Sequence, residues 1–475
     1  MLIRPLINAA ICVTFCANFV SPAGAAGLND PFSTADLLKP PTALAPSEDG
    51  ELQPCSAPGA APFFLTDVVN RALCGNPQTR EVWANARAQA TNVGRAKAAY
   101  LPSLDASLSA SRNKNRGGTL LAPVDRNQRN YDLSLSWLLY DFGGREASMT
   151  NAMELLTAAN ATQDATVQAL FLNAVKAYYQ LQASEAAGAA AAEAEKAALE
   201  SLNAADARYK VGVATPADKL QAQTAHSQAL LNRISADGNL QTARGTLANV
   251  MGLNAASDVQ LAATGDMPAP AEFDANIRQL IDEAMRRRPD LLAAEARARA
   301  AQAAVNVARA SGRPSVSLGL SGGDVRSGGL PDAKSTALGL TLNIPLFSGF
   351  DTTYKIRAAE AQAQANTAQS EAIRLQVGLD VWNNYQALST ATQTIRSSAD
   401  LLASAEQSQR MALGRYKAGM GSILDVLNAQ SALASARQQR VQALYNWNVT
   451  RVSLAKAMGS LDRGLIESLS DAKTP

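Results

Sequence analysis

The feature that most constrains this sequence is an internal repeat. Pro77 and Pro289 stand 212 residues apart, and the residues that follow them match in order. Further along the spacing becomes 207, and residues 208–212 (Arg-Tyr-Lys-Val-Gly) correspond to residues 415–419 (Arg-Tyr-Lys-Ala-Gly). A period of about 210 residues is longer than that of common solenoids. The sequence therefore predicts a duplicated domain.

Each copy has the same order of predicted elements: a helix, an alternating hairpin, a long helix, a turn and a returning helix. Proline ends the helix before each hairpin, and glycine with polar residues marks each turn. Repeat 1 is expected over 63–256, with hairpin 102–140 and tip turn 208–218; repeat 2 over 272–460, with hairpin 314–346 and tip turn 415–425.

The hairpins alternate polar and apolar residues, as in Ser103-Leu104-Asp105-Ala106-Ser107-Leu108. Strands of about ten such residues are long enough to cross a bilayer when tilted. Four strands cannot close a barrel, so three chains would be needed for twelve strands. The alternative is a hairpin that packs one face on a soluble core. Four aromatic residues lie where a membrane girdle is expected: Trp137, Tyr140, Phe347 and Phe350.

A very long helix is predicted after each hairpin. Residues 145–210 and 351–417 contain no proline. A helix of about 65 residues is roughly 100 Å long and must pack along partner helices. Alanine fills many of its seam positions, which favours close coiled-coil contacts.

The N-terminal residues are typical of an exported protein. Residues 1–26 have a basic start, an apolar run and small residues at the end, as a signal peptide does. Residues 27–62 form a Pro/Ala-rich tail, and residues 461–475 a C-terminal tail. Cys55 and Cys74 would remain after cleavage in an oxidising compartment, where either a disulfide or two separate thiols is expected.

Composition and motifs exclude several functions. The chain has 43 Lys and Arg against 41 Asp and Glu, which argues against a nucleic-acid binder. A single histidine excludes a multi-histidine metal site, and no phosphate-binding loop of the Walker type is present. We therefore expect no catalytic residues, no metal and no cofactor, and energy for any transport would come from a partner.

The duplicated order of helix, hairpin, long helix and Arg-Tyr-x-x-Gly turn resembles the TolC-type outer-membrane efflux proteins, over residues 63–460. This resemblance implies a mixed α/β membrane protein: a trimeric twelve-stranded outer-membrane β-barrel, four strands per chain, continued by a long periplasmic α-helical coiled-coil barrel. The implied partners are two further copies (a homotrimer), a periplasmic adaptor (membrane fusion protein), an inner-membrane ABC exporter or other pump, and outer-membrane lipid.

The resemblance also implies roles for the two tip turns. The implied adaptor-docking residues are Arg208, Tyr209, Val211, Gly212, Arg415, Tyr416, Gly419 and Ser422. The implied entrance gate or cation-selecting residues are Asp218, Tyr416 and Asp425. The family often places a basic gate residue where this chain has Gly421, which puts that link in doubt.

Three functions are compatible with this sequence. The first is a passive conduit for type I secretion of a protein substrate. The second is an outer-membrane factor for efflux of small molecules such as drugs or metals. The third, of another class, is a periplasmic coiled-coil adaptor or scaffold without a barrel.

Overall fold

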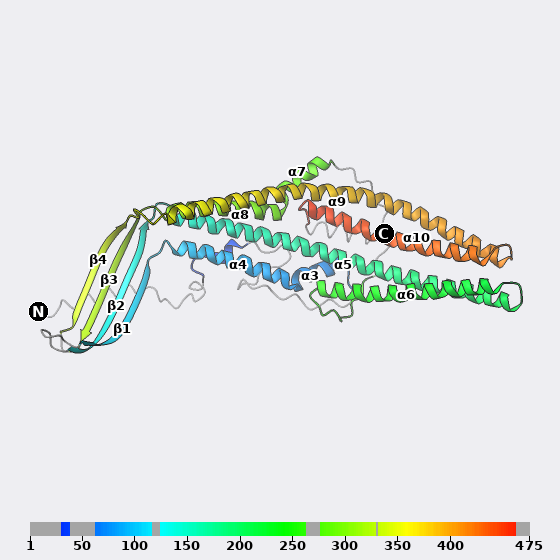
Figure 1. Cartoon of the computed structure of the whole chain (residues 1–475), viewed down its shortest axis with the longest axis horizontal. Helices are drawn as coiled ribbons and strands as arrows, with labels where there is room; N and C mark the ends of the chain where they lie inside the picture. The colour runs from blue at the N-terminus through cyan, green and yellow to red at the C-terminus, as the bar shows by residue number, and fades with distance from the viewer. Residues whose placement is uncertain (1–29, 39–61, 116–123, 263–275, 329–330, 462–475) are drawn as a thin grey trace. The chain divides into compact units, whose positions relative to one another are not determined.

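The computed structural model describes residues 30–38, 62–115, 124–262, 276–328 and 331–461. Within these ranges the order of two short helices, two strands and two longer helices occurs twice (Figure 1). The elements are η1 (Thr34–Leu37), α3 (Leu65–Gly75), α4 (Pro77–Ala98), β1 (Ser103–Asn115), β2 (Val124–Tyr140), α5 (Gly144–Lys210), α6 (Pro216–Val250), α7 (Ile277–Arg287), α8 (Pro289–Ala310), β3 (Ser315–Ser327), β4 (Ala333–Asn343), α9 (Asp351–Lys417) and α10 (Ile423–Ala457). No helix among the described residues has the length and apolar character needed to span a membrane.

The described residues form two compact units, and each takes segments from both halves of the sequence. Unit 1 contains residues 30–38, 86–156 and 299–364, and unit 2 contains the remaining described residues. The helices α5 and α9, of 67 residues each, contribute to both units.

Unit 1 contains one antiparallel sheet with the strand order β1-β2-β3-β4 (Figure 1). Leu104, Leu135, Leu320 and Leu338 pair in succession, so one apolar row crosses all four strands. The neighbouring row consists of Ser103, Ser136, Gly319 and Gly339. The side chains of its two serines lie on the other face of the sheet. One face of the sheet is therefore apolar and the other polar, as the alternation in the sequence predicts.

Part of the N-terminal tail packs on α4 within unit 1. Lys97 Nζ donates a hydrogen bond to the carbonyl oxygen of Phe32 at 3.3 Å. Thr34 is buried, and a Cβ atom at Gly94 would lie 2.9 Å from Thr34 Cγ2. Glycine at position 94 therefore leaves the room that this segment occupies.

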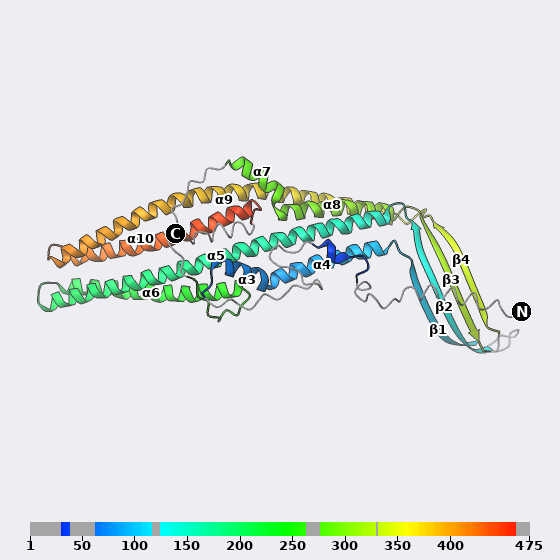
Figure 2. The ribbon, with the colours of Figure 1, turned by 180° about the vertical axis from the view of Figure 1, so that it is seen from behind.

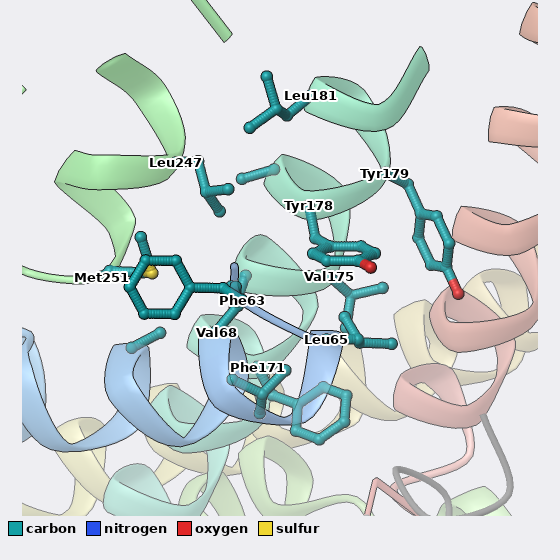
Figure 3. Packing of buried hydrophobic residues seen from close by; sticks show 14 of the residues in the cluster. Phe63, Leu65, Val68, Phe171, Val175, Tyr178, Tyr179, Leu181, Leu247 and Met251 are labelled. Carbon is teal, nitrogen blue, oxygen red and sulfur yellow. The ribbon is translucent and has the colours of Figure 1, made fainter. Parts of the chain in front are cut away.

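The main hydrophobic core of unit 2 joins α3, α5 and α6 (Figure 3). Val68 of α3, Val175 of α5 and Leu247 of α6 are fully buried there. Each such side chain contributes about 1.5–3 kcal/mol when it leaves water. Phe63 adds a parallel bridge to Leu261 beside this core.

Glycine allows the end of α6 to touch the end of α3. Gly252 has a φ of +74°, and a Cβ atom there would lie 2.5 Å from the carbonyl oxygen of Gly75. The ends of α10 and α7 in the second copy have the same arrangement, because a Cβ atom at Gly459 would lie 2.9 Å from the carbonyl carbon of Arg287. Any other residue at either position would push the two segments apart.

Arg288 connects α7, α8 and α9 through two carboxylates. Its Nη2 atom donates to Asp290 Oδ2 at 2.6 Å, and its Nη1 atom donates to Asp380 Oδ2 at 2.7 Å. The Arg288 side chain is 11% exposed. Burial raises the pKa of Asp290, but the hydrogen bonds and charge of Arg288 outweigh burial and bring this pKa below its usual value.

Removing Arg288 is expected to destabilise unit 2. The R288A variant leaves Asp290 and Asp380 without the cation between them, which lowers the free energy of unfolding by about 2 kcal/mol. Denaturant titration of the full-length protein in detergent, followed by circular dichroism, measures this loss. R286A is the matched control, because Arg286 is an exposed neighbour and its removal changes stability by less than about 0.5 kcal/mol. Equal effects of the two variants would contradict the assignment.

The stabilisation by Asp290 is expected to depend on pH. Because its folded-state pKa is lowered, its contribution is complete above the ordinary carboxyl pKa of about 4 and is lost as the pH falls through the folded-state pKa. The stability difference between the wild type and D290N should therefore be larger at pH 7 than at pH 3. The same difference at both pH values would contradict this expectation.

Candidate functional site

The two helical turns of unit 2 form the candidate site. The first joins α5 to α6 and the second joins α9 to α10, and both lie at the same end of this unit (Figures 1 and 2). They contain all the residues that the sequence analysis assigns to adaptor docking and gating. The structure brings the two turns into contact through a small shared core.

Each turn begins with glycine in the left-handed conformation. Gly212 has a φ of +80° and Gly419 a φ of +78°. The N–H of Val213 donates to the carbonyl of Arg208 at 3.0 Å, and that of Met420 donates to the carbonyl of Arg415 at 2.9 Å. This pattern closes the last helical turn and satisfies its free carbonyl groups. The glycines thus have a structural role that is sufficient to explain their presence.

Each returning helix begins with a reciprocal cap. Asp218 accepts hydrogen bonds from the backbone N–H and the hydroxyl of Thr215, both at 2.9 Å. Asp425 accepts the backbone N–H of Ser422 at 3.2 Å, and Ser422 Oγ accepts the N–H of Asp425 at 3.2 Å. These bonds fix both carboxylates beside the turns, where the positive helix N-terminus also favours them.

Arg208 joins the first turn to the second. Its Nη2 atom donates to the carbonyl oxygen of Tyr416 at 2.7 Å. The guanidinium carbon lies 4.2 Å from the centre of the Tyr416 ring, in cation–π geometry. One side chain therefore makes two different interactions with the same residue of the other hairpin.

Tyr416 lies in the small core between the turns. Its side chain is 6% exposed and packs with Ala205 of α5, Ala222 of α6, and Ile423 and Val426 of α10. Tyr416 itself belongs to α9, so all four helices contribute to this core. The equivalent residue in the first copy, Tyr209, is 41% exposed. The two tyrosines of the repeat thus have different environments.

Two further polar contacts join α5 to α10 along the same side. Gln430 Nε2 donates to Ser201 Oγ at 3.0 Å. Arg437 Nη1 lies 2.6 Å from Glu193 Oε2. Together with the Arg208–Tyr416 contact, these pairs form a line of links between the first hairpin and the second.

An ion-pair cluster stabilises the first turn. Asp206 lies 2.7 Å from Lys210 Nζ and 2.8 Å from Lys219 Nζ, so it connects α5 to α6. The hydrogen bonds from Lys210 and Lys219 hold the pKa of Asp206 below its usual value. The sequence analysis missed this cluster, because its residues lie on either side of the turn and belong to no motif.

The turns expose apolar side chains. Val211 is 72% exposed, Val213 is 71% exposed and Met420 is 70% exposed. Exposed apolar residues grouped at a turn are typical of a surface that binds another protein. Gly421 lies at the side of this surface, and a Cβ atom there would lie 3.2 Å from both Arg415 Cβ and the Tyr416 nitrogen. A long basic side chain at this position would crowd the turn.

The four expected girdle residues lie in unit 1 and are exposed. Trp137 is 38%, Tyr140 57%, Phe347 76% and Phe350 63% exposed. The Trp137 indole N–H donates to the carbonyl oxygen of Tyr100 at 2.9 Å. The rings of Phe347 and Phe350 pack edge to face, with centroids 5.4 Å apart. Their role in a membrane girdle stays a prediction.

The predicted cysteine pair is only partly covered by the structure. Cys55 lies outside the described residues, and Cys74 is half-buried in α3. A disulfide between them therefore stays a prediction. Within the ranges that the structure describes, no group of His, Cys, Asp and Glu is arranged to hold a metal ion.

Comparison with known proteins identifies the family. The model of the family described as outer membrane efflux protein matches residues 68–253 and 280–460. Protein CyaE of Bordetella pertussis is 31% identical over 439 residues, which cover 91% of this chain and 92% of CyaE. The toluene efflux pump outer membrane protein TtgC of Pseudomonas putida is 26% identical over 407 residues, covering 83% of this chain and 82% of TtgC.

The fold agrees with this family. The solved structure of the outer membrane protein VceC of Vibrio cholerae matches with a TM-score of 0.72 and 22% identity, over 83% of this chain and 96% of VceC. The expected fold class is thus confirmed: each chain contributes four strands to an outer-membrane barrel and long helices to a periplasmic helical barrel. Proteins of this family are passive channels and not enzymes, and they work as trimers with an adaptor and an inner-membrane pump. The family model covers most of the sequence, and this chain belongs to the outer membrane efflux protein family.

Proposed function

We propose that this chain is the outer-membrane conduit of a type I secretion system and passes a protein substrate. The observation that carries the proposal is the 31% identity with CyaE over about nine-tenths of both chains. It agrees with the first of the three functions with which the sequence is compatible. The ABC exporter and the adaptor of that system would be the inner-membrane and periplasmic partners.

Small-molecule efflux is the second candidate. The 26% identity with TtgC, whose name describes a toluene efflux pump component, favours it. The adaptor or scaffold alternative has lost its basis, because the family assignment gives the four strands a place in an outer-membrane channel.

The exposed apolar side chains of the turns support docking of the adaptor there. Val211, Val213 and Met420 offer an apolar surface, and Tyr209 and Arg415 lie beside it. The left-handed glycines at 212 and 419 have open space around their Cβ positions, so a partner backbone can approach closely. An adaptor bound at this surface would contact the C-terminal ends of α5 and α9.

The link between the hairpins supports a gate at the same place. Arg208 holds the backbone and the ring of Tyr416, and Tyr416 lies within the small core between the turns. Opening of a helical entrance by separation of the two hairpins must break this contact. In three symmetry copies, Asp218 and Asp425 would also supply six carboxylates near the entrance, which favours cations.

A gene deletion distinguishes the two candidate functions. Loss of this chain is expected to abolish export of the protein substrate of its ABC exporter, with the substrate accumulating inside the cell. Immunoblots of culture medium and cell fractions measure this, and susceptibility to a panel of drugs and metals is measured in the same strains. Normal protein export together with increased drug or metal susceptibility would support the efflux alternative and contradict type I secretion.

The Arg208 contact predicts a conductance phenotype. R208A removes a charged hydrogen bond and a cation–π contact, together worth about 1–3 kcal/mol, so the open population should increase about tenfold. Single-channel recording of the purified trimer in planar bilayers measures this population. R415A is the matched control, because the equivalent arginine has only a 3.5 Å contact with its own turn. An R208A trimer that conducts like the wild type would exclude this gate.

The caps predict a selectivity phenotype. Asn at positions 218 and 425 can keep the capping hydrogen bonds while it removes the charge. The D218N/D425N double variant should therefore fold as the wild type does and lose most of its preference for potassium over chloride. Reversal potentials in a salt gradient measure this preference. An unchanged reversal potential would show that these carboxylates do not face the ion path.

A further inference from the structure

The apolar face of the sheet in unit 1 has the height of a membrane. On β2 this face extends from Tyr131 to Tyr140, about 30 Å along the strand and about 23 Å tall at the usual barrel tilt. This agrees with the apolar band of about 25 Å in outer-membrane barrels. The exposed apolar residues of this face are Leu104, Leu108, Tyr131, Leu133, Trp137, Tyr140, Leu320, Leu338, Leu340 and Leu342.

The same face becomes charged toward the hairpin ends of the strands. The register pairs Tyr131 with Leu108 and Asp324, and the rows beyond this pair bring charged residues of all four strands to the same side. The basic residues are Arg112, Lys114, Arg129, Arg326 and Lys334. The acidic residues are Asp125 and Asp324, with Asp332 just before β4. We call the five basic residues the basic belt.

The opposite face carries only two charges at this level among the described residues, one basic and one acidic. Its residues in the same rows are Ser109, Ser111, Asn113, Arg126, Gln128, Asn130, Asp132, Gly323, Val325 and Ser335, so Arg126 is the one basic residue and Asp132 the one acidic residue among them. If the basic residues at this end served only to contact water, the face that lines the barrel lumen would carry as many of them. The basic residues instead lie on the face that continues the lipid-contacting band.

The acidic residues neutralise only part of the belt. Asp125 lies 2.7 Å from Arg112 Nη2, and Asp324 lies 3.2 Å from Arg326 Nη2. Arg129 and Lys334 make no ion pair with any described residue. Both are exposed, so their charges are available to an external anion.

A hollow lies where the apolar band meets the belt. Gly322 pairs with Leu133 and Thr336 and lies in a shallow, open depression of about 410 Å³. Leu133 and Tyr131 are among its apolar lining residues, and Asp132, Asp324 and Lys334 are its charged lining residues. Apolar side chains and the ammonium group of Lys334 therefore border the same depression, together with two carboxylates.

We propose that the basic belt binds the phosphate groups of phosphorylated lipids in the outer leaflet of the outer membrane. The helices are periplasmic and join the opposite end of the sheet, so the belt lies at the outer surface. Arg129 and Lys334 bind the phosphate directly, and the hollow beside Gly322 accommodates the neighbouring part of the lipid. Basic residues at the end of an apolar face bind anionic headgroups while their stems remain in contact with acyl chains.

Lipid binding to the purified full-length trimer in neutral detergent tests this proposal. Native mass spectrometry measures the affinity for diphosphoryl lipid A, and phosphatidylcholine serves as the zwitterionic comparator. The wild type should bind lipid A at least tenfold more tightly than phosphatidylcholine. The R129Q/K334Q variant should lose about tenfold of its affinity for lipid A and none for phosphatidylcholine.

R126Q is the matched control, because Arg126 lies at the same level on the lumen face. It should bind lipid A as tightly as the wild type. Circular dichroism and the mass of the trimer establish that each variant is folded. Equal affinity for the two lipids, unchanged lipid A binding by R129Q/K334Q, or an equal loss in R126Q would each overturn the proposal.

Discussion

The pairing of backbone groups in lipid is the constraint on which the rest of this structure depends. An N–H or C=O group without a partner in the hydrocarbon costs several kcal/mol, so a membrane-spanning sheet must close on itself. In one chain, β1 and β4 each have a paired strand on one side only. Closure therefore requires further copies, with β4 of one chain beside β1 of the next, and this is why the barrel of the family is shared by a trimer. Association with further copies is a requirement of the four-stranded sheet, and the family meets it with three chains.

The helical part meets a different constraint, because it must associate along long surfaces with few large side chains. Alanine is the commonest buried residue type, which allows the helices to approach closely, and specific pairs fix their alignment. Arg233 with Glu195 joins α6 to α5, and Arg437 with Glu193 joins α10 to α5. Two successive acidic residues on α5 thus contact two different helices. These pairs contribute little energy each, but they define the register between neighbouring helices that small side chains alone leave free to slide.

The sequence could predict the features that depend on local periodicity. Alternation predicts the strands, Gly212 and Gly419 predict the helix ends, and the Thr-x-x-Asp and Ser-x-x-Asp patterns are typical of capped helix starts. It could not predict which side chain meets which across the hairpins. The run Arg286-Arg287-Arg288 looks uniform, yet Arg288 alone is largely buried, between Asp290 and Asp380. The resemblance implies that Arg208 is an adaptor-docking residue, and its partner Tyr416 is 208 positions away. Such contacts are set by the packing of whole helices, which leaves no pattern in a single sequence.

The two repeats differ at the turns, so the contact between the hairpins runs from the first turn to the second and not in both directions. Duplication supplied an Arg-Tyr pair to each turn, yet Arg208 reaches across to Tyr416, whereas Arg415 contacts only its own turn. Tyr416 is buried because it fills the core between the hairpins, and Tyr209 is left exposed outside that core. The buried tyrosine fixes the second turn, and the arginine that holds it belongs to the first. A partner that binds the exposed first turn therefore acts on the residue that supplies the link, and needs no access to the buried one. The duplication thus produced two hairpins of the same design, and an arginine of the first binds a tyrosine of the second.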